Sequence, residues 1–281
     1  MENQNKQYWY VTGCTSGTGL ALTKKLLSLG HKVTGTSRNL KKLEELPFFK
    51  DESFLGVQVD LVNRKSVKDS IDKAIKHFGT LTHVINNAGY GLIGAIEEVT
   101  EEENRELMDA LYFGPINVIV SVLPHFREKK NGYIFNVSSI GGIKAYPGFG
   151  NYSAAKFALA GMSEALAADV KPFGIKVTCI ILGYIVTGFQ NGNQACKHLI
   201  PEYKTLEVGV PQMRIYENTL VKGDVNKVAD VIIENSIKPE LPYNLFIGPI
   251  DTFTMAEAKV NELKQQIESQ KERNSKVVLE K

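Results

Sequence analysis

Short apolar runs rich in β-branched and aromatic residues alternate with longer segments of helical spacing, and this alternation constrains the fold more than any other feature. The β-rich runs are YWYVTG (8–13), KVTGTSR (32–38), FLGVQVD (54–60), LTHVINNAG (81–89), GYIFNVSS (132–139), IKVTCIIL (175–182) and PYNLFIG (242–248). Apolar residues follow helical spacing at 20–30, 63–79, 100–127 and 152–171. Because neighbouring parallel strands need a long crossover connection, usually a helix, the alternation predicts an α/β fold with a parallel sheet.

Composition and charge limit the partners. Hydrophobic residues make up 43% of the 281 residues, and no repeat, low-complexity segment or linker divides the chain, so we expect one domain over 1–281. Lys and Arg number 33 against 31 acidic residues, a net charge of +2, which provides no strong field for nucleic acid or an anionic membrane. No uncharged apolar run reaches about 18 residues, so we expect no membrane span and no nucleic-acid binding.

The three cysteines indicate the compartment. Cys14, Cys179 and Cys196 are odd in number and far apart in sequence, which favours reduced thiols over a disulfide framework. No Cys-x-x-Cys pair occurs, and we expect no metal site. The polar first residues, MENQNKQ, contain no apolar signal segment. These features predict a cytoplasmic protein.

A glycine-rich loop, TGCTSGTG at 12–19, joins the first β-rich run to the first helical segment. At this junction a dinucleotide pyrophosphate would meet the positive end of the helix, and glycines leave room for the backbone to approach phosphate. A glycine-rich turn without a ligand is the alternative, but the position after an N-terminal strand favours a cofactor site. The candidate residues are Thr12, Gly13, Thr15, Ser16, Gly17, Thr18 and Gly19.

The end of the second β-rich run, TSRN, bears on the choice of cofactor. In dinucleotide folds an acidic residue here holds the ribose 2'-hydroxyl of NAD, whereas an arginine accommodates the 2'-phosphate of NADP. Ser37 and Arg38 stand here without a carboxylate, and the guanidinium fork suits phosphate. The alternative is an ordinary surface arginine, but the pattern favours NADP over NAD.

Four motifs in order carry a family resemblance: the glycine loop, NNAG at 86–89, NVSS at 136–139 and YSAAK at 152–156. With them the chain resembles the short-chain dehydrogenase/reductase family over about residues 8–250. The resemblance implies a single Rossmann-like, doubly wound parallel sheet of about seven strands with helices on both faces. It also implies an oxidoreductase that moves hydride between a nicotinamide cofactor and a small-molecule carbonyl or secondary alcohol.

Carried over position by position, the resemblance assigns site residues. Ser139, thirteen positions before Tyr152, matches the family's catalytic serine, and Tyr152 and Lys156 match its catalytic pair, with Lys156 also on the nicotinamide ribose. The other implied cofactor contacts, from the adenine end to the nicotinamide end, are Asp60, Leu61, Asn87, Ala88, Gly89, Gly183 and Thr187.

The spacing of the catalytic pair has a physical rationale. Tyr152 and Lys156 are four residues apart on a predicted helix, so both side chains face the same way. A nearby ammonium favours phenolate over phenol, and we expect it to lower the tyrosine pKa towards neutrality. Tyr152 would then serve as general acid or base, while Ser139 holds the substrate oxygen.

The chain departs from the family pattern in two places. The family's usual helix asparagine, which helps hold a water in the proton relay, is Leu111, whose side chain cannot hydrogen-bond. The usual Pro-Gly after the sixth strand is Leu182-Gly183, a mild change because the glycine remains. Leu111 keeps a second hypothesis open: a dinucleotide-binding sensor or assembly protein with weak or no turnover.

The remaining segments concern substrate and partners. Residues 188–223 lack periodicity and are predicted to form a substrate lid, and 252–273 are predicted to form an amphipathic helix docked on its own domain rather than on a partner. Family members are usually oligomers, so we expect a homodimer or homotetramer formed by the helices at 100–128 and 152–171. Four aromatic residues near the presumed site favour an apolar or aromatic substrate, namely Tyr146, Phe149, Tyr184 and Phe189.

Overall fold

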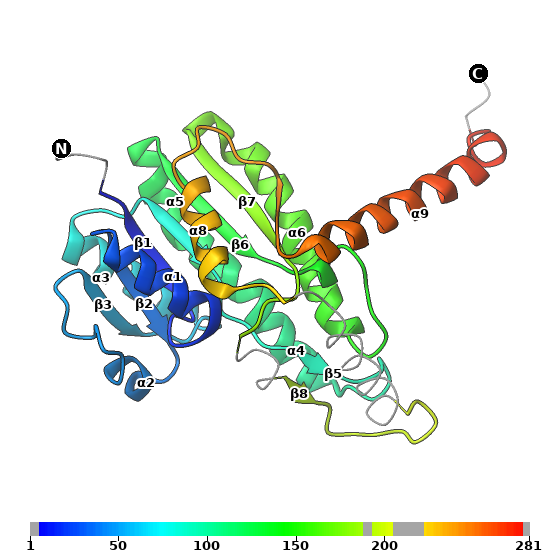
Figure 1. Ribbon diagram of the computed structural model, residues 1–281, viewed down its shortest axis with the longest axis horizontal. Helices are drawn as coiled ribbons and strands as arrows, with labels where there is room; N and C mark the ends of the chain where they lie inside the picture. The colour runs from blue at the N-terminus through cyan, green and yellow to red at the C-terminus, as the bar shows by residue number, and fades with distance from the viewer. Residues whose placement is uncertain (1–5, 188–192, 205–221, 278–281) are drawn as a thin grey trace.

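The computed structural model describes residues 6–187, 193–204 and 222–277. Seven strands form one parallel sheet in the order β3-β2-β1-β4-β6-β7-β9, which confirms the predicted doubly wound α/β fold (Figure 1). The strands are β1 Tyr8–Thr12, β2 Lys32–Ser37, β3 Phe54–Gln58, β4 His83–Asn86, β6 Gly132–Val137, β7 Ile175–Leu182 and β9 Asn244–Ile247. A separate pair, β5 Leu92–Ile93 and β8 Gln194–Ala195, lies away from this sheet.

Helices cover both faces of the sheet (Figure 1). The α-helices are α1 Gly17–Ser28, α2 Leu40–Glu44, α3 Arg64–Phe78, α4 Glu101–Met108, α5 Gly114–Lys129, α6 Gly150–Val170, α8 Val225–Asn235 and α9 Ile250–Asn274. Short 3-10 segments are η2 Ile140–Gly142 and η3 Lys171–Phe173, and a π-helical segment, η1 Asp109–Phe113, joins α4 to α5. Successive side chains of a strand point to opposite faces, so each strand contributes to two apolar cores.

The two cores show this alternation directly. Trp9 and Val11 of β1 pack with α1 and α8 on one face. Tyr10, between them, packs with α3 and α5 on the other face. All three side chains are fully buried. A sheet covered on both faces explains why the sequence reads as nearly continuous apolar runs rather than strict alternation with polar residues.

The structure corrects several boundaries. Most predicted strands end earlier than expected, because the residues after each strand leave the sheet and form the loops of the site. The single helix predicted over 100–127 is divided by η1, and neither α2 nor α8 was predicted. Thr100 and Glu103 form a capping box that opens α4.

The helical stretch Glu101–Lys129 is long and apolar enough to cross a membrane, the one such helix in the described ranges, and 44% of its most apolar window is buried within the protein. Buried core helices meet the same two criteria, and Val118, Val122 and Phe126 of this stretch lie in the core. The expectation that no segment spans a membrane therefore stays a prediction.

The C-terminal helix α9 docks on the domain through its first turns only. Thr252 and Ala256 are its buried residues. Every described residue from 260 to 277 is exposed, and the helix runs out from the body of the molecule (Figure 1). The prediction of a helix docked on its own domain is wrong for this outer part.

Candidate active site

A cleft of about 670 Å³ opens where the loops follow the carboxyl ends of the sheet strands. Ligands of open α/β sheets bind at this edge. Most of the predicted site residues line it: Gly13, Thr15, Ser16, Gly17, Thr18, Ser37, Arg38, Asp60, Leu61, Asn87, Ala88, Gly89, Ser139, Tyr152, Lys156, Gly183 and Thr187. Segments far apart in the sequence thus form one continuous cavity.

The glycine loop is tightly closed on itself. Gly13 adopts a φ of +69°, and a Cβ there would lie 2.9 Å from the Cα of Ala88. A Cβ on Gly19 would lie 2.3 Å from the carbonyl oxygen of Gly13. These contacts leave no room for a side chain at either glycine. The exposed backbone of such a loop can approach a dinucleotide phosphate closely.

Two predicted cofactor residues, Thr12 and Gly19, do not line the cleft and instead hold its walls together. Thr12 Oγ1 accepts hydrogen bonds from the backbone N–H groups of Asn87 at 2.9 Å and Ala88 at 3.0 Å. The Asn87 side-chain amide donates to the Thr12 carbonyl at 2.9 Å. The NNAG segment is thereby fixed against the glycine loop.

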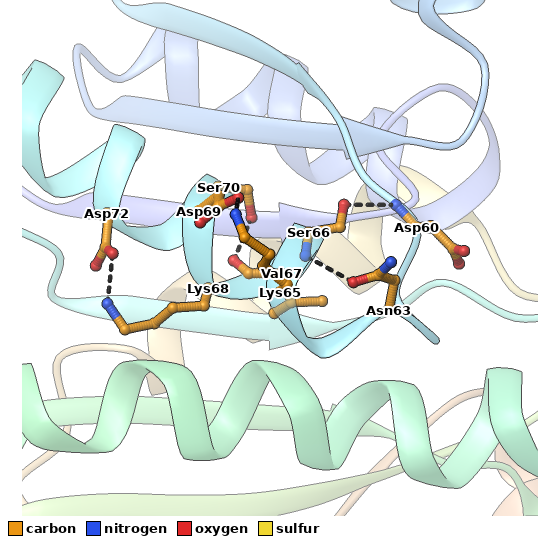
Figure 2. Close-up of polar contacts among 9 residues, drawn as sticks. All are labelled: Asp60, Asn63, Lys65, Ser66, Val67, Lys68, Asp69, Ser70 and Asp72. Carbon is orange, nitrogen blue, oxygen red and sulfur yellow. Dashed lines mark hydrogen bonds and ion pairs between the residues drawn. The ribbon is translucent and has the colours of Figure 1, made fainter.

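At the predicted adenine end, Asp60 is positioned by the start of α3 (Figure 2). Its backbone N–H donates to Ser66 Oγ at 3.2 Å, and its own Oδ1 accepts from the N–H of Val62 at 3.1 Å. Ser66 in turn donates its N–H to Asn63 Oδ1, the N-cap of α3, at 3.0 Å. The turn that carries Asp60 is therefore held by hydrogen bonds to the first turn of α3.

Lys42 joins Arg38 at this end of the cleft. It lies on α2, whose N-cap Asn39 accepts a hydrogen bond from the Lys42 N–H at 3.2 Å. The sequence reasoning missed Lys42 because it missed α2. Two cationic side chains thus line the cleft just beyond the end of β2.

The structure brings Ser139, Tyr152 and Lys156 together. Ser139 precedes η2 and hydrogen-bonds the Tyr152 phenol. Lys156 lies one turn along α6, with Nζ 5.8 Å from the centre of the Tyr152 ring. The Lys156 ammonium donates to the carbonyl oxygen of Val137 at 2.8 Å. Both Tyr152 and Lys156 are buried.

Burial governs the protonation of this pair. It raises the pKa of Tyr152 to about 12, opposed by the hydrogen bond to Ser139. It also lowers the pKa of Lys156 to about 8. The expectation that the ammonium lowers the Tyr152 pKa towards neutrality is therefore wrong for the protein alone, because desolvation outweighs any attraction between the two groups. A phenol that stays protonated at neutral pH can donate its proton.

A chain of buried amides and hydroxyls anchors α6 beneath these residues. Asn86 Nδ2 on β4 donates to Asn136 Oδ1 on β6 at 2.8 Å, and Asn136 Nδ2 donates to Ser163 Oγ on α6 at 2.8 Å. Ser163 Oγ donates onward to the Leu159 carbonyl at 2.6 Å. The helix that carries the catalytic pair is thus tied to two sheet strands.

The opposite wall of the cleft is more apolar. Phe149 contacts the Tyr152 ring edge-to-face, with centroids 6.1 Å apart. Tyr146 donates from its hydroxyl to Met255 Sδ at 3.2 Å. Tyr184 also lines the cleft, whereas Phe189 lies outside the described residues. The sequence reasoning missed Asn193 and Gln194 near β8, and Asp251, Thr252 and Met255 from the first turns of α9.

Two buried carboxylates hold the segment that carries Asn193. Glu98 Oε1 accepts from the N–H of Ile200 at 3.1 Å, and Glu103 Oε1 accepts from the N–H of Lys197 at 3.0 Å. Their second oxygens accept from backbone N–H groups of their own segment. Of the predicted lid over 188–223, residues 188–192 and 205–221 lie outside the described residues.

Comparison with known proteins decides the family. The family model described as short chain dehydrogenase matches residues 7–197. The chain belongs to the short-chain dehydrogenase family. It is therefore an oxidoreductase, as the four motifs predicted.

Individual relatives of this short-chain dehydrogenase agree. A 3-ketodihydrosphingosine reductase from Bacteroides thetaiotaomicron is 34% identical over 254 residues, covering 89% of this chain and 90% of the relative. The crystal structure of a short-chain dehydrogenase from Streptomyces avermitilis is 28% identical and covers 99% of this chain and all of its own, with a TM-score of 0.88. A serine dehydrogenase complexed with NADP+, 24% identical over 86% of this chain and 95% of its own, shares the fold with a TM-score of 0.74.

This short-chain dehydrogenase carries its main departure at Leu111, on the π-helical segment η1. Leu111 is 1% exposed and belongs to the same apolar cluster as Leu107, Tyr152 and Ala155. A Cβ on Gly89 would lie 2.8 Å from Leu111 Cδ2, so the leucine also packs closely against the NNAG loop. The position where family members carry a polar relay side chain is filled by hydrocarbon.

Proposed function

We propose that the protein is an NADP(H)-dependent oxidoreductase that transfers hydride between the nicotinamide and a carbonyl or secondary alcohol, with Tyr152 as general acid and base. One observation carries the proposal: a single cleft has the glycine loop and Arg38 at one end and the Ser139, Tyr152 and Lys156 side chains at the other. The glycine contacts and the cationic pair fit a dinucleotide phosphate.

In this proposal the nicotinamide, when bound, supplies or takes the hydride. The residues of the chain do the rest. Ser139 holds the substrate oxygen by hydrogen bond, Tyr152 donates its phenolic proton to that oxygen during reduction, and Lys156 holds the nicotinamide ribose. The raised pKa of Tyr152 favours the protonated phenol that reduction needs.

The preference for NADP rests on charge at the end of β2. Arg38 and Lys42 line this end of the cleft, and Ser37 stands where an NAD-binding chain would carry a carboxylate. An arginine fork and an ammonium would both bind a 2'-phosphate, whereas a ribose hydroxyl needs neither.

The substrate that we propose is a ketone with an apolar body. Phe149, Tyr146, Tyr184 and Met255 line the wall opposite the glycine loop. The similarity to a 3-ketodihydrosphingosine reductase supports the inclusion of 3-ketodihydrosphingosine among the compounds tested.

The test is NADPH consumption with a panel of ketones, aldehydes and quinones that includes 3-ketodihydrosphingosine. We expect turnover with at least one ketone and a loss of about 10²-fold to 10⁴-fold in kcat for Tyr152→Phe, with NADPH affinity retained. A protein that binds NADPH but consumes none with any compound would instead be the dinucleotide-binding sensor, for which Leu111 is the main support. Equal turnover by Tyr152→Phe would refute the role of Tyr152.

We further propose a cytoplasmic homodimer or homotetramer without a membrane span or nucleic-acid partner. Phe113, at the junction of η1 and α5, is 48% exposed, and Phe157 on α6 is 42% exposed, which supports an interface through these helices. Light scattering at micromolar concentration tests it: the mass of a single chain would refute the oligomer.

A further inference from the structure

The outer part of α9 carries an apolar stripe that the rest of the described chain leaves exposed. Val260 and Ile267 are each 61% exposed, and Leu263 is 45% exposed. These three residues, the α9 stripe, recur at spacings of three and four residues, which places them along one line of the helix. α9 projects from the body along this part (Figure 1).

The stripe belongs to a heptad pattern along the helix. Phe253, Val260 and Ile267 are seven apart, and Ala256, Leu263 and Gln270 form a second series three positions later. Two such series are the a and d positions of a coiled coil. The exposed apolar part of the pattern has the β-branched Val260 and Ile267 at a and Leu263 at d, whereas Ala256 is buried against the domain. So narrow a seam fits one partner helix, whereas a helix that lies in a membrane surface has a broader apolar face.

The charges on α9 argue against a membrane surface as its partner and favour α9 of a second copy. Between Glu257 and Asn274 the helix carries four acidic and four basic residues, so this part has no net charge to attract anionic lipid. In a coiled coil, the residues beside the seam decide orientation. On α9 these are Glu257, Lys264 and Lys271 on one side, and Lys259, Gln266 and Arg273 on the other.

Orientation follows from these positions. A parallel pair would place Lys259 of each copy opposite Lys264 of the partner subunit, which gives two repulsive contacts between like charges. An antiparallel pair centred between Asn261 and Glu262 places Glu257 opposite Lys264 of the partner subunit, which is attractive twice over. The antiparallel pair also keeps the two protein bodies at opposite ends of the paired helices.

We propose that the α9 stripe of one copy packs antiparallel on the α9 stripe of a second copy, and that this contact forms a homodimer interface. In it, Val260 lies against Leu263 of the partner subunit, flanked by the two Glu257 and Lys264 pairs. This interface is separate from the one proposed for the helices around η1 and α6, so it exists whether or not the protein turns over a substrate.

The first test is the mass of the full chain at micromolar concentration by sedimentation velocity. Leu263→Glu places a charge in the seam, whereas Gln265→Glu places the same charge on the opposite side of the helix. We expect Leu263→Glu to halve the mass and Gln265→Glu to leave it unchanged. Circular dichroism shows whether each variant is folded, and an unchanged mass for folded Leu263→Glu overturns the proposal.

The second test fixes orientation and partner. Lys264→Glu should weaken self-association by roughly tenfold, and Glu257→Lys likewise, whereas the double variant should restore it and the two single variants should pair with each other. A tighter dimer for Lys264→Glu indicates a parallel pair and overturns the antiparallel one. A wild-type protein that stays monomeric but floats with phosphatidylserine vesicles, and loses this with Leu263→Glu, shows a membrane-binding stripe and overturns the proposal.

Discussion

The two ends of the cleft are built by different means. Apart from the charged Arg38 and Lys42, the cofactor end consists mainly of backbone at the carboxyl ends of strands, with glycines where space is short and hydrogen bonds between neighbouring loops. The substrate end consists of side chains from β8, the segment after β6 and the first turns of α9. A site made of backbone depends on sheet geometry, whereas one made of side chains on loops can change without disturbing the fold. The cofactor end should therefore tolerate substitution less well than the substrate end.

Gly19→Ala tests most directly whether the cofactor end tolerates substitution poorly. The added Cβ would lie 2.3 Å from the carbonyl oxygen of Gly13 and 2.6 Å from Asn87 Nδ2, so the loop must move. We expect NADPH affinity to fall by about 100-fold or more, as overpacking costs of a few kcal/mol imply. Fluorescence titration with NADPH measures it. Gly161→Ala on α6, where a Cβ meets nothing within 4 Å, is the matched control, and equal affinity for both variants would contradict the prediction.

The next largest effect concerns the charge at the cofactor end. Arg38→Ser should weaken NADPH binding by roughly 30-fold and leave NADH binding nearly unchanged, because only NADPH carries the 2'-phosphate. Titration with both cofactors measures the ratio. Lys41→Ser removes a nearby charge outside the cleft lining and should leave it unaltered. A similar loss for both cofactors would mean that Arg38 does not read the phosphate.

The substrate end is tested through Glu98, whose carboxylate holds the segment that carries Asn193. Glu98→Gln replaces an oxygen that accepts a backbone N–H by an amide nitrogen that cannot accept, so either Ala95 or Ile200 loses its partner. Leaving a buried N–H unpaired costs about 1 to 3 kcal/mol. We expect the KM for the ketone to rise by about tenfold while NADPH affinity stays the same. The exposed Glu102→Gln is the control, and an unchanged KM for Glu98→Gln would show that this carboxylate does not shape the substrate wall.

The smallest effect is a pH dependence where the two ends meet. Burial lowers the Lys156 pKa to about 8, so its ammonium is mostly protonated at pH 7 and mostly neutral at pH 9.5. Since the charged form is the stronger hydrogen-bond donor to a ribose hydroxyl, NADPH affinity should fall several-fold over this interval. Titrations across the interval measure it, and Lys156→Met should show a flat profile. A flat profile for the wild type would remove Lys156 from the cofactor contacts.

Sequence reasoning reached the cofactor end because its signals are local. A glycine loop after a strand, an arginine at the end of the next strand, and Tyr152 and Lys156 one turn apart can each be recognised within a few residues. Met255 and Asn193 could not be found in this way, since their spacing gives no sign that α9 and β8 reach the cleft. The prediction of a lowered Tyr152 pKa failed for a related reason. The pKa depends on burial, and burial is set by the whole fold.

The chain of buried amides and hydroxyls beneath α6 has a consequence for how heat would inactivate the protein. The sequence of α6, GNYSAAKFALAGMSEALAADV, has small or apolar residues on almost every side of the helix. Apolar packing alone therefore favours no single rotation of the helix about its own axis. The bonds from Asn86 through Asn136 to Ser163, together with those between Lys156 and the end of β6, fix the rotation of the helix. If warming broke them, the phenol and the ammonium would swing off target together, and catalysis would fail while the sheet was still intact.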